Sequence, residues 1–195
     1  MEEKASKEGH YPRDSEKTRA RILQSAIELF SNSSYDMVRS RDISQKAKVD
    51  VALINRYFGS KKDLFVAVLD AISQDKPELT SDDAESRICE DFSKRLSGKN
   101  FQNTATAVRL IAFSALSPEV SSLLRERISG EIDRLSELLG VVDKTPATTL
   151  IAYVLGMHTL LQMLTEEERE SLSPEALLDP IRVVFQKKHC AETPA

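Results

Sequence analysis

The sequence predicts an all-α protein in which a small basic unit precedes a larger acidic helical body. The chain has 195 residues, 41% of them hydrophobic, which is enough to fill a real core. Apolar residues recur at helical spacing, without strand alternation or internal repeats. The formal net charge is −4, yet Tyr11–Lys62 carries 11 Lys and Arg against 6 Asp and Glu, while the chain from Asp63 onward carries 14 against 22. This asymmetry is expected if only the first part touches phosphate.

Cysteine usage and hydropathy limit the class of protein further. Cys89 and Cys190 have no CxxC spacing and the histidines do not cluster, so neither a disulfide scaffold nor a metal site is predicted. No apolar run approaches the roughly 18 residues of a membrane span, and the charged N-terminus lacks a signal-peptide core. We expect a soluble, cytoplasmic protein without a cofactor.

The beginning of the chain predicts a flexible arm followed by one long helix. Residues 1–14 are charged and lack periodicity, so we expect them to be flexible. Over 15–32, apolar residues form a broad stripe at helical spacing. The stripe consists of Ile22, Leu23, Ala26, Ile27, Leu29 and Phe30.

Three shorter helices are expected next, over 41–47, 51–57 and 60–75, before a break at Lys76–Pro77. Each follows a residue that can cap it, because short polar side chains bind the free N–H groups of a first helical turn. These caps are Ser40, Asp50 and Ser60, the last paired with Asp63 in a capping box.

Beyond the break, longer helices alternate with turn residues. We expect them at about 81–97, 103–116, 118–139, 146–165 and 174–188. Gly130 and Pro180 fall inside two of these helices, where we expect a weak point or a kink.

One of these segments indicates a homodimer. Residues 148–164 are apolar on nearly every face, so the helix needs cover on both sides. A two-fold contact built from this helix and the helix over 174–188 would give a four-helix interface. The expected interface residues are Leu177, Leu178, Ile181, Val184 and Phe185.

The short helices match a helix-turn-helix. Those over 41–47 and 51–57 are joined by "KVD" and braced by the helix before them. In such a unit the second short helix enters the DNA major groove, where its outward residues reach base edges.

Thr18–Asp70 resembles the N-terminal DNA-binding domain of the TetR family of transcriptional regulators. The resemblance rests on "TRARILQSAIELF", "RDISQKAKV" and "INRYFGSKKDLFVAVL", in the family's order. The sequence departs from the common pattern at Ser34 and Lys48 in place of Gly, at Asn55 in place of Tyr, and at Tyr57 in place of His. These departures leave every apolar anchor in place but prevent the transfer of a known operator sequence.

The resemblance implies a set of DNA contacts. Ser40 and Arg41 would meet the backbone or a nearby base, and the groove face would be formed by Val51, Ala52, Leu53 and Asn55, with Arg56, Tyr57 and Lys61 at phosphates. An apolar side chain can meet a thymine methyl, Asn can pair with adenine, and Arg or Lys can meet phosphate. Leu53 and Tyr57 could equally be packing residues.

The resemblance also divides the chain into domains. It implies an N-terminal arm (1–14), a helix-turn-helix domain with its connecting helix (15–75), a helical ligand-binding and dimerisation domain (76–189) and a flexible tail (190–195). Pocket candidates are residues whose polarity or shape is unusual for their helix, namely Arg109, Phe113, Tyr153, Met157, His158 and Gln162. For His158, a hydrogen-bonded structural role is the competing interpretation.

We therefore expect a transcriptional repressor that binds a palindromic DNA operator as a homodimer and is released by a small molecule. Two alternatives are an all-helical interaction protein and a helical enzyme without DNA binding. We expect no enzyme, because the sequence has no phosphate loop, nucleophile elbow or metal-spaced His or Cys cluster.

Overall fold

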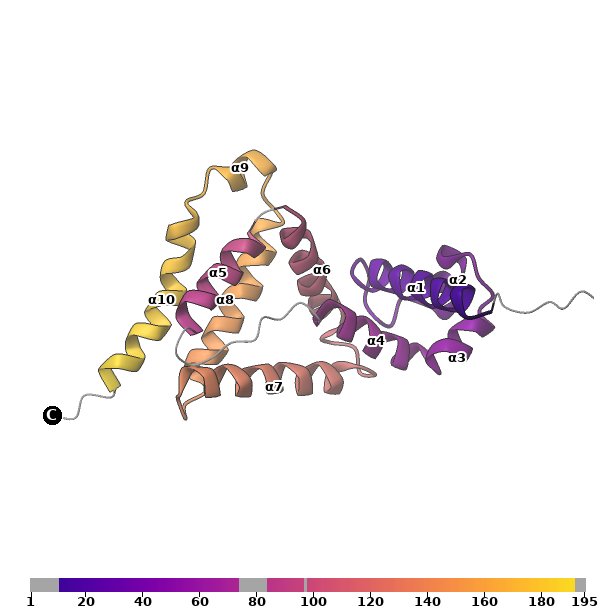
Figure 1. The fold of residues 1–195 in the computed structure, drawn as a ribbon, viewed down its shortest axis with the longest axis horizontal. Coiled ribbons are helices and arrows are strands. Elements are labelled where there is room, and N and C mark those ends of the chain that lie inside the picture. Colours follow the sequence, from indigo (N-terminus) through magenta and orange to yellow (C-terminus); the bar gives the residue numbers. More distant parts are fainter. Residues whose placement is uncertain (1–10, 74–83, 97, 192–195) are drawn as a thin grey trace, which may run out of the picture.

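The computed structural model describes residues 11–73, 84–96 and 98–191, and this part of the chain is all helical (Figure 1). The predicted fold class is confirmed. The helices are α1 (Tyr11–Phe30), α2 (Ser40–Ala47), α3 (Ala52–Phe58), α4 (Lys61–Ser73), α5 (Ala84–Arg95), α6 (Gly98–Ser114), α7 (Ser121–Leu139), α8 (Thr145–Leu161), α9 (Glu166–Glu170) and α10 (Pro174–Ala191).

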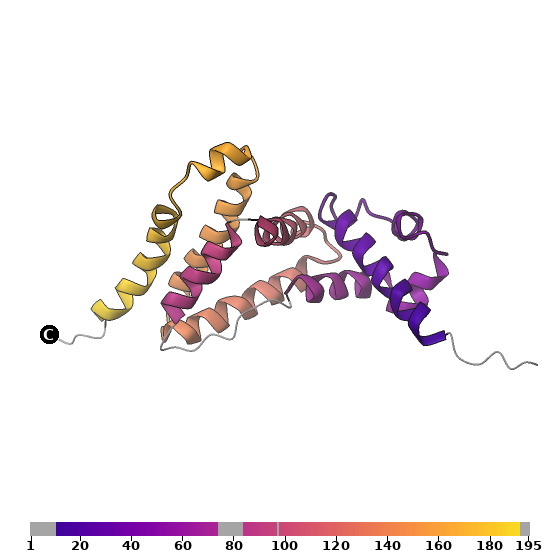
Figure 2. The same cartoon turned by 45° about the horizontal axis from the view of Figure 1, so that its top comes forward.

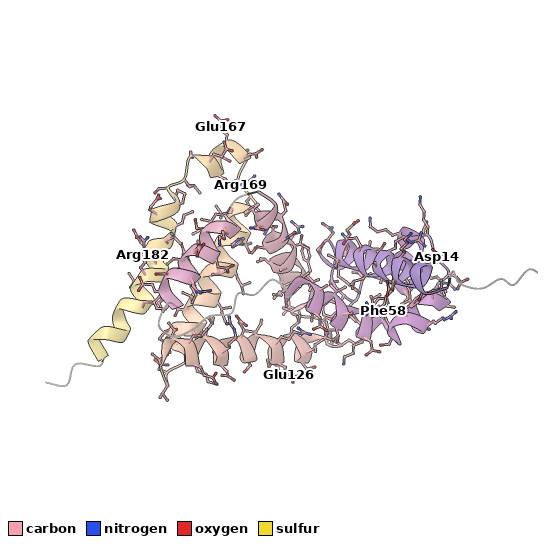
Figure 3. All side chains as sticks on the ribbon, viewed as in Figure 1. Asp14, Phe58, Glu126, Glu167, Arg169 and Arg182 are labelled. Atoms are coloured by element: carbon pink, nitrogen blue, oxygen red, sulfur yellow. The ribbon has the colours of Figure 1, made fainter. Side chains whose placement is uncertain are left out.

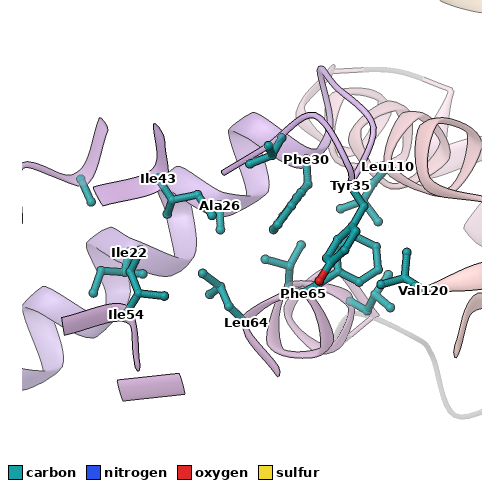
Figure 4. Packing of buried hydrophobic residues seen from close by; sticks show 14 of the residues in the cluster. Ile22, Ala26, Phe30, Tyr35, Ile43, Ile54, Leu64, Phe65, Leu110 and Val120 are labelled. Atoms are coloured by element: carbon teal, nitrogen blue, oxygen red, sulfur yellow. The ribbon is translucent and has the colours of Figure 1, made fainter. Parts of the chain in front are cut away.

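Helices α1 to α4 form a unit at one end of the molecule, and α5 to α10 form the other end (Figures 1 and 2). The first unit is organised around three aromatic side chains. The rings of Phe30 and Tyr35 stack at 5.7 Å, and Phe65 of α4 meets both edge-on, at 5.1 and 5.2 Å. Ile43 of α2 and Ile54 of α3 are fully buried in the same cluster (Figure 4). Each short helix therefore contributes a fully buried isoleucine to the first core, together with further residues that pack beside it.

The first core continues into the second part of the molecule. Leu110 of α6, Val120 before α7 and Leu124 of α7 belong to the same buried cluster as the aromatic side chains. The α1–α2 loop is also tied to the turn between α6 and α7. There the Tyr35 hydroxyl donates to Glu119 Oε1 at 2.7 Å. The two parts are therefore joined by packing as well as by the chain.

A second core holds α5, α7, α8 and α10 together. Its buried residues include Phe92, Leu135, Leu139, Leu150 and Ile181. The helix ends fit their caps: Gly140 ends α7 in the left-handed region at φ 64°, and Pro146 lies in the first turn of α8.

Several helix boundaries differ from the sequence predictions. α1 begins at Tyr11 rather than at 15, because Pro12 fits a first helical turn, where no N–H is needed. α6 begins at Gly98 rather than at 103, and α10 runs to Ala191 rather than ending at 188. α9 was not predicted at all, although Thr165 and Glu168 form a capping box at its start, at 2.8 and 3.2 Å.

The two positions where a weak point or kink was expected lie inside continuous helices. Gly130 lies in α7 and Pro180 lies in α10, and each helix is continuous past that residue. The expected break at Lys76–Pro77 and most of the expected arm and tail lie outside the described residues. Within the described ranges, no helix combines the length and the apolar run needed to cross a bilayer.

Candidate nucleic-acid interface

The start of α2 is fixed by a capping interaction. Arg39, in extended conformation, is the N-cap, and its backbone N–H donates to Asp42 Oδ2 at 2.8 Å. Ser40, predicted to be the cap, is instead the first helical residue and is half-buried. Arg41 follows it and is exposed. Both residues thus lie where the positive end of a helix favours an anion, as expected for backbone contacts.

The turn between α2 and α3 contains an unusual backbone conformation. Lys48 ends α2 in the left-handed region, at φ 53° and ψ 51°, where glycine is the favoured residue. Lys48 thus adopts the backbone conformation that a glycine would normally supply at this turn, and the turn leads into α3. The side chain of Lys48 is exposed at this corner.

α3 is held by a cap at its start and by one buried side chain in its middle. Asp50 Oδ1 accepts the Ala52 N–H at 2.7 Å, as predicted from the sequence. Ile54 is fully buried. At the other end, Gly59 adopts φ 89°. Ser60 Oγ accepts the Asp63 N–H at 3.0 Å and donates to Asp63 Oδ2 at 2.6 Å, which gives the capping-box-like start expected from the sequence. α3 is therefore a short, rigid helix that turns its other faces outward.

The residues predicted for the groove face divide into two groups. Val51, Ala52, Asn55 and Arg56 are exposed, and Val51 keeps 40% of its surface. Leu53 and Tyr57 are half-buried and pack against the first core. Leu53 and Tyr57 are therefore in part packing residues. The side chains of Val51, Ala52, Asn55 and Arg56 are accessible to a partner.

Lys61 was predicted to hold a phosphate, and the structure gives its ammonium another position. Nζ donates to the carbonyl oxygens of Tyr35 and Val38 at 3.0 and 3.1 Å, and it lies 3.8 Å from the centroid of the Tyr35 ring. An ammonium has three donors, so two are already used inside the domain. Lys62, the next residue, is exposed.

We expect Lys61→Ala and Lys62→Ala to act on different properties. Lys61→Ala leaves two carbonyls without their donor and should lower the free energy of unfolding by about 1–3 kcal/mol in urea denaturation. Lys62→Ala should leave stability within about 0.5 kcal/mol and weaken binding to all DNA sequences alike. An unchanged unfolding midpoint for Lys61→Ala would contradict the role given to its ammonium.

The predicted ligand contacts do not gather in one cavity. A cavity of about 310 Å³ lies between α4, α5, α6, α7 and α8, and none of the six candidates lines it. Arg109 instead joins the two parts of the molecule, donating to Ser31 O at 3.1 Å and to Gln162 Oε1 at 2.8 Å. Phe113 is 44% exposed. The unusual residues on α6 and α8 thus make structural contacts.

The candidates on α8 are also explained by packing. His158 is fully buried, with Nδ1 3.1 Å from Val154 O and its ring beside Phe92 and Phe101. The Tyr153 hydroxyl donates to Leu177 O at 2.7 Å, and Met157 packs against the second core. The charged residues of α7 that line the cavity were not predicted from the sequence, although Arg127, Glu131 and Arg134 share one face at helical spacing.

The predicted dimer residues also need correction. Leu178, Ile181 and Phe185 are no more than 8% exposed in a single chain, where they belong to the second core. Leu177 and Val184 are half-buried against the same core. The apolar face of α10 is therefore already covered by its own chain. The exposed stripe lies on α8 and the turn after it, and contains Ala152, Gly156, Thr159 and Leu160 of α8 and Met163 of the turn.

The two short helices α2 and α3, the turn between them and the exposed outer face of α3 together define a helix-turn-helix unit. Residues 22–68 match the family described as "Bacterial regulatory proteins, tetR family". The helix-turn-helix domain of this chain is therefore similar to that of the TetR family of transcriptional regulators.

Two curated relatives match this part of the chain. The HTH-type transcriptional repressor NicS of Pseudomonas putida is 38% identical over 66 residues, which cover 34% of this chain and 31% of that protein. The HTH-type transcriptional repressor Rv3405c of Mycobacterium tuberculosis is 35% identical over 79 residues, which cover 40% and 42%. The matched segment therefore spans less than half of either relative. Both names describe regulators, in agreement with the expectation of a protein that is not an enzyme.

Solved structures match most of the chain in fold. NalD, the secondary repressor of the MexAB-OprM multidrug efflux pump in Pseudomonas aeruginosa, has a TM-score of 0.62 at 19% identity, covering 89% of this chain and 97% of that one. SCO4454, a TetR-family regulator from Streptomyces coelicolor, has a TM-score of 0.62 at 20% identity, covering 88% and 96%. At this identity the likeness concerns the fold alone.

Proposed function

We propose that the protein is a transcriptional repressor that binds a palindromic operator as a homodimer and is released by a small molecule. The observation that carries the proposal is the outward face of α3. Four neighbouring residues, Val51, Ala52, Asn55 and Arg56, are exposed on a helix that is anchored by a single buried Ile54. In a helix-turn-helix, the second short helix lies in the major groove and presents outer residues of this kind to base edges.

The chemistry of this face fits DNA. Val51 and Ala52 offer small apolar surfaces for thymine methyls, and Asn55 can pair with the donor and acceptor edge of adenine. Arg56, Arg41 and Lys62 surround the face with positive charge for phosphates. The basic balance of Tyr11–Lys62 supports the same partner.

The dimer in this proposal uses α8 and α10, with α8 supplying the exposed surface. Leu160 and Met163 keep 61% and 78% of their surface exposed. A Cβ added at Gly156 would meet nothing within 4 Å of its own chain, so the glycine serves no close contact inside one protomer. It would allow a second copy of α8 to approach closely. Figure 3 places Phe58 of α3 and Arg182 of α10 toward opposite ends of the molecule, so a contact there leaves α3 free.

Two variants on α3 should separate base recognition from phosphate binding. Asn55→Ala should change sequence preference, with a loss of about 1–3 kcal/mol on the preferred operator and little loss on random DNA. Arg56→Ala should weaken both DNAs alike and reduce the dependence of affinity on salt. Fluorescence anisotropy on the two DNAs measures both effects. Equal losses on both DNAs for Asn55→Ala would refute its assignment to a base.

A further inference from the structure

The 310 Å³ cavity between α4 and α8 lies between the two cores of the molecule. Its wall contains Leu69 of α4 and Leu124 of α7, which belong to the first core, and Phe92 of α5 and Leu150 of α8, which belong to the second. A molecule inside it would touch both the helix-turn-helix unit and the helical body.

The wall is mostly aliphatic, and this limits the shape of an occupant. Branched side chains such as Ile111, Leu135 and Val154 dominate it, and Phe92 is the single aromatic residue among the described residues that line it. Flat aromatic ligands are usually held by aromatic side chains that stack on them. A wall of this kind instead suits a flexible aliphatic body, which gains from burial of its apolar surface.

The charged residues that line the cavity are three residues of α7 and Asp91 of α5. Arg127, Glu131 and Arg134 share one face of α7. Arg134 donates twice to Glu131, at 2.7 and 3.3 Å, so these two charges neutralise each other within the helix. Arg127 is bound differently, because its partner Asp70 belongs to α4.

The two residues of the Arg127–Asp70 ion pair differ in their position relative to the cavity. Arg127 lines the cavity and its side chain is 33% exposed, whereas Asp70 does not line it and is 56% exposed. If an anion entered, Asp70 could turn to water at little cost, since ion pairs this exposed contribute only about 0–1 kcal/mol. A cation that paired with Asp70 would have to displace the Arg127 guanidinium. The guanidinium would then lie without its carboxylate in a partly apolar cavity, which is less favourable.

We propose that the cavity binds an amphipathic molecule with an aliphatic body and a carboxylate head, and that the head pairs with Arg127 in place of Asp70. The ligand carboxylate takes the place of Asp70 as the partner of Arg127, and the Asp70 carboxylate turns to water. This exchange also removes a direct tie between α4 and α7. This inference rests on the proposed function. The exchange gives the route by which the ligand loosens α4, and only two residues separate α4 from the end of α3.

Isothermal titration calorimetry on the full chain without DNA tests the ligand class directly. The probes are decanoate, decanol and decylamine, which share one aliphatic chain and differ in the head, all below the concentration at which they form micelles. The wild-type protein should bind decanoate at least about ten-fold more tightly than decanol, as expected for a charge-assisted hydrogen bond. Equal binding of the two, or tighter binding of decylamine, would overturn the proposal.

Three variants identify the side chain that binds the ligand carboxylate. Arg127→Gln should abolish the preference for decanoate over decanol, while Arg125→Gln, an exposed neighbour that does not line the cavity, should keep it. Asp70→Asn should tighten decanoate binding several-fold, because it removes the competing carboxylate. A role of Arg127 in folding alone would not produce this gain. An Arg127→Gln protein that keeps the preference, or an Asp70→Asn protein that binds more weakly, contradicts the exchange. Neither result depends on whether the protein binds DNA.

Discussion

Leu160→Asp should convert the protein into a monomer and lower operator affinity by roughly 100-fold or more. Leu160 lies on the exposed stripe of α8 and keeps 61% of its surface in a single chain. If a second α8 packed on this stripe, the carboxylate of the introduced aspartate would lose its water without gaining a partner, and this cost opposes the dimer. DNA affinity then falls because a monomer binds one half-site and loses the high effective concentration that linkage to a second half-site provides.

Light scattering and anisotropy on the same samples check this prediction. Leu116→Asp is the matched control, since Leu116 is 92% exposed in the turn between α6 and α7, away from the α8 stripe. It should keep the mass and the affinity of the wild-type protein. A dimeric Leu160→Asp protein would place the interface elsewhere. Ile181→Asp, by contrast, should unfold the chain, because Ile181 is fully buried in the second core.

Tyr35→Ala should lower the free energy of unfolding by about 3–5 kcal/mol, as large-to-small changes of buried aromatic residues do. Tyr35 is fully buried, stacks on Phe30 and packs edge-on against Phe65. Its ring also supports the Lys61 ammonium, at 3.8 Å. Removing the ring therefore damages the first core and the start of α4 together. Urea denaturation followed by circular dichroism measures the loss.

Tyr35→Phe isolates the hydroxyl from the ring. The hydroxyl donates to Glu119 Oε1 at 2.7 Å, and burial together with this carboxylate raises the pKa of Tyr35 well above its ordinary value. The phenol thus stays protonated and keeps donating across the physiological range. We expect Tyr35→Phe to cost about 1.5–3 kcal/mol, as for a hydrogen bond to a charged group. A loss equal to that of Tyr35→Ala would mean that the ring packing contributes little.

Local patterns predicted the helix-turn-helix unit well. The stripe on α1, the caps at Asp50 and Ser60, and the buried Ile54 are all set by residues close in sequence. Helix periodicity and capping depend on neighbours within a few positions, so they can be recognised in a single chain. Lys48 shows the limit, because its left-handed conformation could be inferred only from the glycine common at that place.

The lining of the cavity and the burial of the α10 stripe within its own chain were not predicted, for the same physical reason. Leu178 and Phe185 form an apolar stripe that could face either a partner or its own chain, and only the position of α5 decides between them. His158 and Arg109 looked unusual for their helices, yet their partners come from distant segments. A residue's surroundings across the fold are not encoded in its helical spacing.

The central claim, that the outward face of α3 reads DNA, is tested most directly by fluorescence anisotropy with genomic fragments from upstream of its own and neighbouring genes. We predict that the full chain binds at least one fragment with sequence specificity, and that its affinity falls steeply as salt rises because phosphate contacts release counterions. On that fragment, Asn55→Ala should lose the preference while remaining folded. Uniformly weak binding to every fragment at low salt would contradict the account.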